Sequence, residues 1–142
     1  EKNTSLDDKV LAYMVTARAD PDKGAFTEAI RGFRNEVSIN KASFAAEARY
    51  EIASCYYSLN DLKNADKAAF ETINKSGSYD FWITRAYILL GDIYFKEKDY
   101  FNAKATLQSV VDNSRTTELK NEAAEKLRTV IDAEKAESKI AG

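Results

Sequence analysis

The sequence predicts an all-α fold, in which three antiparallel helix pairs form a superhelix and a C-terminal helix caps it. One proline and five glycines among 142 residues leave few turns, whereas all-β folds need many. Apolar residues recur three and four positions apart in every long segment, which is the helical period. Similar stretches also recur at a period in the thirties, which is typical of a helical solenoid. A chain of this length buries roughly 70% of its unfolded surface, so we expect one domain over residues 1–142.

The repeat is clearest around three alanines, Ala29, Ala65 and Ala103, which lie 36 and 38 residues apart. The surrounding stretches FTEAIRGF, LKNADKAAF and YFNAKATL resemble one another. Tyr56 and Tyr94 each precede their alanine by nine residues. Each repeat therefore has room for one helix, a short hinge and a second helix.

Seven helices are expected in order along the chain. They cover Leu6–Ala19, Phe26–Ile39, Phe44–Leu59, Asp61–Lys75, Asp80–Glu97, Tyr100–Asn113 and Glu118–Lys135. The pairs fall near residues 6–39, 44–75 and 80–113, and the helix over 118–135 is the cap. The last helix has an apolar stripe formed by Leu119, Ala123, Leu127, Val130 and Ile131.

Local residues account for the breaks between these helices. The stretch DPDKG at residues 20–24 is a turn of the Pro-Asp-Gly type. Asn60-Asp61 and Lys98-Asp99 are short hinges, and their aspartates can cap the helices after them. Gly77 interrupts the chain before the fifth helix. Short hinges make the two helices of a pair antiparallel.

The composition argues against several classes of function. The net charge of −2 and the pI of about 5.3, without a local basic cluster, argue against nucleic-acid binding. The chain has no histidine, no glycine-rich phosphate loop and no paired-cysteine zinc spacing, so we predict no enzyme, no cofactor and no metal. Its one cysteine, Cys55, is expected to be buried and unreactive. No apolar run reaches the roughly 18 residues of a membrane span.

The repeats resemble the tetratricopeptide repeat, whose pattern is aromatic-x2-Leu-Gly-x2-Tyr followed by Ala-x3-Phe and Pro. One copy has Tyr87, Leu90, Gly91, Tyr94, Ala103 and Leu107 at these spacings. An earlier copy has Arg49, Ile52, Ala53, Tyr56, Ala65 and Ala69. The first copy keeps Ala29 and Phe33 but needs about five extra residues at the DPDKG turn. The closing proline is absent from all three copies, where Lys41, Gly77 and Arg115 stand. The resemblance covers about residues 6–115.

The motif also has a physical meaning. Gly91 and Ala53 remove bulk where two helices cross closely, and this packing must offset the roughly 0.5–1 kcal/mol that glycine costs in a helix. Ala65 and Ala103 are small for the same reason. Tyr56, Tyr87 and Tyr94 are expected to fill the core between paired helices.

The resemblance implies a protein–protein interaction scaffold that holds a peptide or helix of a partner in a concave groove. The groove would be lined by first-helix residues beside the packing face: Glu47, Tyr50, Ser54, Tyr57 and Ser58 in one copy, and Arg85, Ile88, Asp92, Phe95 and Lys96 in the next. Groove exposure and burial by a neighbouring repeat are equally open for Tyr57 and Phe95. The Lys/Asn carboxylate clamp of some family members is not carried over, because Tyr50 and Ser54, or Ile88 and Asp92, stand in its places.

Several alternatives remain open from the sequence. Phe81 and Trp82 either anchor the preceding loop to the stack or contact a partner. The stretch FAAEARYEIASCYYSLNDLKNA also resembles repeats of bacterial cell-envelope members of the family. The chain could therefore be a glycan-binding or structural envelope module in the periplasm or at the outer membrane, with the cytoplasm as the alternative location. A non-catalytic helper domain of a larger enzyme, a processed product or fragment, and a homo-oligomer are further expectations.

Overall fold

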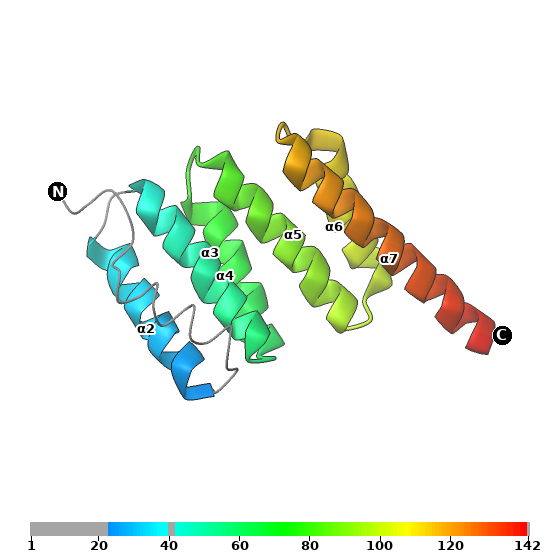
Figure 1. Ribbon diagram of the computed structural model, residues 1–142, viewed down its shortest axis with the longest axis horizontal. Helices are drawn as coiled ribbons and strands as arrows, with labels where there is room; N and C mark the ends of the chain where they lie inside the picture. The colour runs from blue at the N-terminus through cyan, green and yellow to red at the C-terminus, as the bar shows by residue number, and fades with distance from the viewer. Residues whose placement is uncertain (1–22, 40–41, 142) are drawn as a thin grey trace. The chain divides into compact units, whose positions relative to one another are not determined.

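The computed structural model describes residues 23–39 and 42–141, and these residues form six helices and no strand. The helices are α2 (Lys23–Ile39), α3 (Ala42–Ser58), α4 (Leu62–Lys75), α5 (Asp80–Lys96), α6 (Tyr100–Asn113) and α7 (Thr117–Ala141), shown in Figure 1. The expected helix over Leu6–Ala19 lies outside the described residues. Within them, the all-α helical-repeat class is confirmed.

The largest difference in helix length is at the C-terminal helix. α7 continues to Ala141, whereas the sequence pattern predicted an end near Lys135. The added turns are rich in alanine, glutamate and lysine, which are strong helix formers, and contain no glycine or proline. α2 and α3 also begin slightly earlier than expected, at Lys23 and Ala42.

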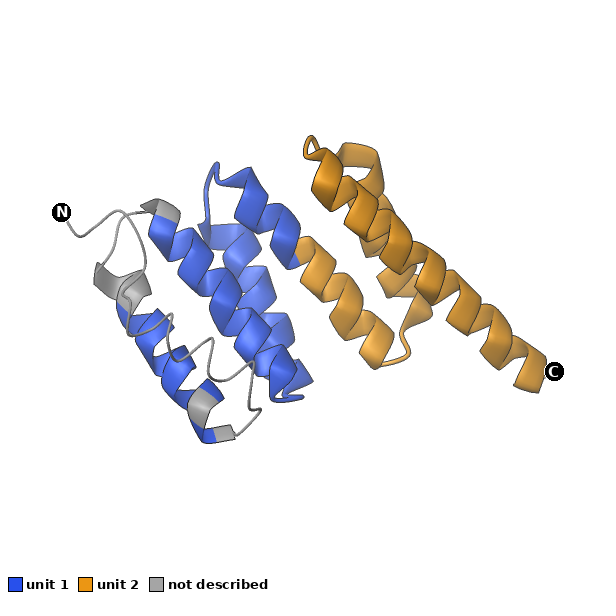
Figure 2. Ribbon diagram, viewed as in Figure 1, with its two compact units in different colours: residues 1–86 blue, residues 87–142 orange. Residues whose placement is uncertain are grey.

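The chain divides into two compact units, Glu1–Ala86 and Tyr87–Gly142, coloured separately in Figure 2. The division falls inside α5, so each unit includes a part of this helix. We describe each unit by itself, and a single domain over residues 1–142 stays a prediction.

The turns after α3 and α5 end their helices in the same way. Asn60 and Lys98 have the left-handed φ values of 61° and 63°. The backbone N–H of the next residue then donates to the carbonyl five residues earlier, over 2.9 Å in one turn and 2.8 Å in the other. This is the Schellman arrangement, which satisfies carbonyls that the end of a helix leaves unpaired.

An aspartate then begins the following helix in both turns. The Asp61 carboxylate accepts from the backbone N–H of Asn64 at 3.2 Å and from its side-chain amide at 2.8 Å. Asp99 makes the same two bonds with Asn102, at 3.2 and 2.7 Å. The predicted caps of α4 and α6 are therefore confirmed.

The core of the first unit is built mainly from small residues. α3 packs against both α2 and α4. Ala29, Phe33, Ala53, Ala65 and Ala69 are completely buried. The small side chains let the helix backbones approach closely, as the repeat pattern predicted, while Phe33 fills the space beside them.

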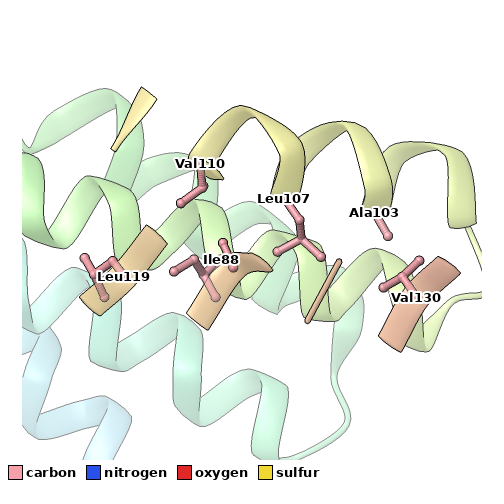
Figure 3. Packing of buried hydrophobic residues seen from close by; sticks show 7 residues of the cluster. Ile88, Ala103, Leu107, Val110, Leu119 and Val130 are labelled. Atoms are coloured by element: carbon pink, nitrogen blue, oxygen red, sulfur yellow. The ribbon is translucent and has the colours of Figure 1, made fainter. Parts of the chain in front are cut away.

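The second unit has a more aliphatic core (Figure 3). It is formed by α6 and α7, which pack together, and by the second half of α5. The buried cluster consists of Ile88, Ala103, Leu107, Val110, Leu119, Ala123 and Val130. A Cβ atom placed on Gly91 would lie 2.6 Å from Cδ2 of Leu107. The predicted close helix crossing at Gly91 is thus confirmed.

The motif tyrosines are less buried than expected. Tyr56 and Tyr94 are only partly buried. Tyr87 is 37% exposed, so its assignment to the core is wrong. A tyrosine has an apolar ring and a polar tip, and its hydroxyl end can stay in water while the rest of the ring packs.

Candidate functional site

Aromatic side chains gather on α3 and the first turn of α5, within the first unit. The rings of Tyr50 and Trp82 lie 5.7 Å apart between centroids. Phe81 meets Trp82 edge to face at 4.8 Å. Trp82 thus fastens the start of α5 to α3, in agreement with the anchoring alternative. Phe81 remains 45% exposed and is available at the surface.

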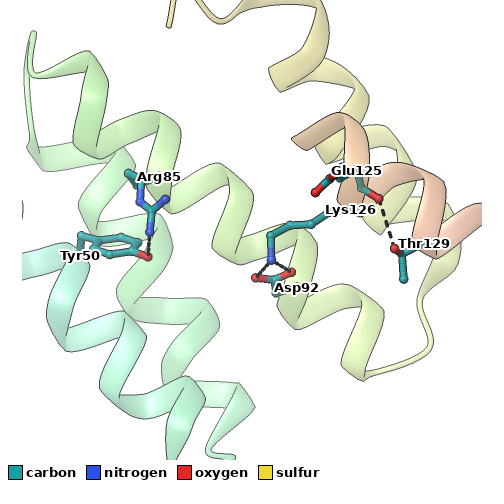
Figure 4. Close-up of polar contacts among 6 residues, drawn as sticks. All are labelled: Tyr50, Arg85, Asp92, Glu125, Lys126 and Thr129. Carbon is teal, nitrogen blue, oxygen red and sulfur yellow. Dashed lines mark hydrogen bonds and ion pairs between the residues drawn. The ribbon is translucent and has the colours of Figure 1, made fainter. Parts of the chain in front are cut away.

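Arg85 adds a polar contact to the same cluster (Figure 4). Its Nη2 atom donates to the Tyr50 hydroxyl at 3.2 Å. Its Cζ atom also lies 5.4 Å from the centroid of the Tyr50 ring, within the range of a cation–π contact. Tyr50 therefore connects to α5 through both its ring and its hydroxyl.

A second polar bridge lies within the other unit, between α5 and α7 (Figure 4). Nζ of Lys126 is 3.0 Å from both carboxylate oxygens of Asp92. The side chains of Lys126 and Asp92 are 34% and 23% exposed. A partly shielded pair of this kind orders both side chains more than a fully exposed pair would.

The two bridges have nearly the same separation in sequence. Arg85 follows Tyr50 by 35 residues, and Lys126 follows Asp92 by 34. This separation is close to the repeat period, because each bridge joins the first helix of a hairpin, α3 or α5, to the helix that follows that hairpin, α5 or α7. Each unit therefore has one polar contact at about the repeat spacing, and this contact orders a charged side chain on α5.

Two of the predicted groove residues are buried. Tyr50 is 8% exposed, and Ile88 is 2% exposed and belongs to the core cluster of the second unit. The expectation that they line an open surface is wrong, because neighbouring helices cover both. Lys96 is exposed, and the other predicted residues within the hairpins are partly buried: Glu47, Ser54, Tyr57, Arg85, Asp92 and Phe95. Ser58 is exposed.

Phe95 has a structural contact as well as a surface. Its ring lies 6.1 Å from that of Tyr100, and both rings pack against the core cluster of the second unit. Tyr57 is likewise partly buried. The two alternatives weighed for these aromatics, exposure and burial, are each partly realised.

Glu47 and Asp92 are the two partly buried carboxylates among the predicted groove residues, and Glu47 has a shifted pKa. Burial raises its pKa above the ordinary value of 4.5, because desolvation disfavours the charged form. Glu47 lies one helical turn before Tyr50 on α3, so the two share a side of that helix.

A polar cluster also fastens the end of α7 to the start of α6. Hydrogen bonds from Tyr100 and Lys98 lower the pKa of Glu137, and the bond to Glu137 raises the pKa of Tyr100. Lys98 Nζ lies 3.2 Å from the Glu137 carboxylate. The sequence pattern did not predict this cluster, because it indicated that the last helix ends near Lys135, before Glu137.

A small pocket in the first unit was also missed. It is lined by Arg34, Arg49, Ile52, Ala68 and Glu71. The sequence did contain one indication, since Arg49 stands where the repeat pattern has an aromatic residue. Arg34 could not have been added, because nothing in the sequence shows that α2 brings it to the same place.

Catalytic and metal chemistry gain no support from the part of the chain that the structure describes. Cys55 is completely buried, as predicted. No group of three histidine, cysteine or carboxylate side chains in residues 23–39 and 42–141 could hold a metal ion. None of the helices described is long and apolar enough to cross a membrane.

The repeat geometry agrees with a comparison against known protein families. A family model described as tetratricopeptide repeat matches residues 46–69 and residues 84–117. Two segments of the chain match this repeat. The first tetratricopeptide match covers most of α3 and part of α4, and the second covers most of α5 and all of α6. No curated protein and no solved structure matches the chain.

The matched tetratricopeptide segments correspond to the two hairpins with identical turns. Their bounds agree with the second and third copies found in the sequence. Tetratricopeptide repeats are generally protein–protein interaction modules rather than catalytic ones. The matches support this family and a protein partner.

Proposed function

We propose that this chain is a non-catalytic interaction scaffold whose first helices bind a peptide or helix of a partner protein. The observation that supports it most is that both tetratricopeptide matches fall on hairpins whose first helices combine aromatic and charged side chains. Aromatic anchors contribute most of the affinity at such surfaces, and charges around them orient the ligand.

Each unit has its own proposed contact surface, formed by the predicted groove residues that are not buried. In the first unit these are Glu47, Ser54, Tyr57, Ser58 and Arg85, and in the second unit they are Asp92, Phe95 and Lys96. The Tyr50 hydroxyl orders the Arg85 side chain by accepting a hydrogen bond from it, and Lys126 orders the Asp92 side chain through an ion pair. A partner segment that is mainly polar, with one or two apolar anchors, suits this mixture.

The narrower interpretations are also proposals. A cell-envelope or glycan-binding role and a helper role beside an enzyme would use the same surface with a different partner. Exposed Phe81 at the start of α5 is one side chain in the first unit on which a sugar ring could stack.

The proposal can be tested by capturing partners from a lysate of the source organism with the immobilised chain. We expect Tyr57→Ala and Phe95→Ala each to lose a protein that the wild-type chain retains. Phe70→Ala is the matched control, because Phe70 is 40% exposed but lies on the second helix α4. Circular dichroism should show that all three variants remain helical.

Lys96→Glu provides a further variant, since an exposed charge can be reversed with little effect on folding. Binding that survives all the first-helix changes, or that Phe70→Ala also removes, would contradict the proposed surface. A captured protein counts as a partner only when its purified form binds with the same dependence on these residues.

A further inference from the structure

We propose that the pocket of the first unit is an oxyanion site, which binds a carboxylate or phosphate group between Arg34 and Arg49. Arg34 comes from α2, Arg49 and Ile52 from α3, and Ala68 and Glu71 from α4. These helices are packed through α3. The site is separate from the proposed partner surface, because it faces the second helices of the hairpins.

The pocket exists because of one departure from the repeat pattern. Arg49 stands at the position where the matched repeat has an aromatic ring and where the other hairpin has Tyr87, a ring that is 37% exposed and so packs over only part of its surface. The arginine side chain instead runs to the end of α4, where its Nη1 atom donates to the carbonyl of Lys75 at 2.9 Å. The space left is about 100 Å³.

The charges around this pocket do not cancel. Nη2 of Arg34 donates to the Tyr56 hydroxyl at 3.0 Å, and Arg49 donates to a backbone carbonyl. Both acceptors are neutral, and among the described residues neither guanidinium is paired with a carboxylate. Glu71 also lines the pocket, but Lys75 lies 3.1 Å from it and offsets its charge. Two positive charges are therefore left over.

The remaining hydrogen-bond donors define the ligand. A guanidinium has five N–H donors in a planar fork that matches the oxygens of carboxylate and phosphate groups. With the described residues, Arg34 and Arg49 each make one side-chain hydrogen bond. The pocket holds only a few water molecules, at roughly 30 Å³ each, so one oxyanion fits and a drug-sized molecule of about 300 Å³ or more does not. Ile52 and Ala68 are buried and give the site an apolar part, while Arg34 and Glu71 are exposed, so the site is open to solvent.

The test is a titration of the full chain, followed by calorimetry and by NMR of the arginine Nε–H groups. The probes are inorganic phosphate and a blocked peptide containing three glutamates, with its glutamine counterpart as the uncharged reference. We expect the Arg34 and Arg49 signals to shift on binding. Arg34→Gln and Arg49→Gln should each weaken binding about tenfold or more.

Arg31→Gln is the matched control for charge. Arg31 lies on α2, is 71% exposed and pairs with Glu28 at 2.6 Å, so its removal changes the net charge equally without touching the pocket. Arg49→Tyr restores the aromatic of the repeat pattern, and should abolish binding while the chain stays folded. Phosphate binding without peptide binding identifies a free ion as the ligand, and preference for the glutamate peptide identifies a partner's carboxylate.

Either of two results would overturn the proposal. One is a wild-type chain that binds neither phosphate nor the glutamate peptide. The other is an Arg31→Gln variant that weakens binding as much as the two pocket variants do, because the effect would then come from overall charge.

Discussion

At Gly91, the gain in helix propensity from a larger side chain can be compared directly with the clash that this side chain would cause. Alanine at a helical glycine normally stabilises a helix by about 0.5–1 kcal/mol. Here the added Cβ would lie 2.6 Å from the Leu107 side chain. We expect the clash to dominate, so Gly91→Ala should destabilise the chain by roughly 1–3 kcal/mol in denaturant unfolding.

Leu107 supplies the control for this prediction. Leu107→Ala removes the atoms that the new methyl group meets, so adding Gly91→Ala to it should cost much less than adding it to the wild-type chain. If the two changes simply add, the contact between Gly91 and Leu107 is not the cause.

The raised pKa of Glu47 predicts the direction in which its contribution to stability changes with pH. Its pKa is raised in the folded state, so its protonated form favours folding below the ordinary value of 4.5, and this contribution is lost as pH rises through the folded pKa. Glu47→Gln should therefore be modestly more stable than wild type at pH 7 and equal to it well below pH 4.5.

Chemical denaturation at a series of pH values measures this difference. Glu125→Gln is the comparison, because Glu125 is exposed on α7 and should show no such gain. A Glu47→Gln variant that is less stable than wild type at pH 7 would mean that the carboxylate has a favourable partner outweighing its desolvation.

At the scale of elements, the two aspartate caps allow the same experiment twice. Asp61→Ala and Asp99→Ala each remove the bond to the backbone N–H three residues later, so each should cost about 0.5–2 kcal/mol. Asp132→Ala, in the middle of α7 and exposed, should be neutral or slightly stabilising. Thermal or denaturant unfolding distinguishes these outcomes, and equal effects at all three sites would show that the caps contribute nothing specific.

Helices and turns were the features that the sequence revealed best. Periodic apolar residues, the two aspartates after short hinges and Gly91 are local features, and each is found in the structure where the sequence put it. The burial of Tyr50 and Ile88, the Asp92–Lys126 pair and the Arg34–Arg49 pocket depend instead on contacts between residues far apart in the chain. The motif does not fix these contacts, because it defines the packing face of each helix but not which side chain of the next hairpin reaches over it.

For the whole molecule, α5 is the element that both compact units share. Ala86→Pro should interrupt its hydrogen bonding at the boundary between them and cost about 3 kcal/mol or more. In the Ala86→Pro variant, hydrogen exchange should then give one opening free energy for the amides of Ala65 and Ala69 in the first unit. It should give a different one for the amides of Leu107 and Val110 in the second unit.

Phe81→Pro is the matched control, because a proline in the first turn of a helix removes no intrahelical bond. It should leave exchange in the second unit unchanged. Identical exchange behaviour of Ala86→Pro and Phe81→Pro would mean that continuity of α5 does not couple the two units.

The twin turns have a consequence for how such a chain could lengthen. Asn60 and Lys98 differ in chemistry, yet the same backbone bonds and the same capping aspartate surround them. All the groups that form each turn lie within about ten residues of one another, so a copied DNA segment encoding one hairpin would bring the complete turn inside that hairpin with it. Gene duplication could therefore add a hairpin to this protein without a new turn having to evolve between its two helices.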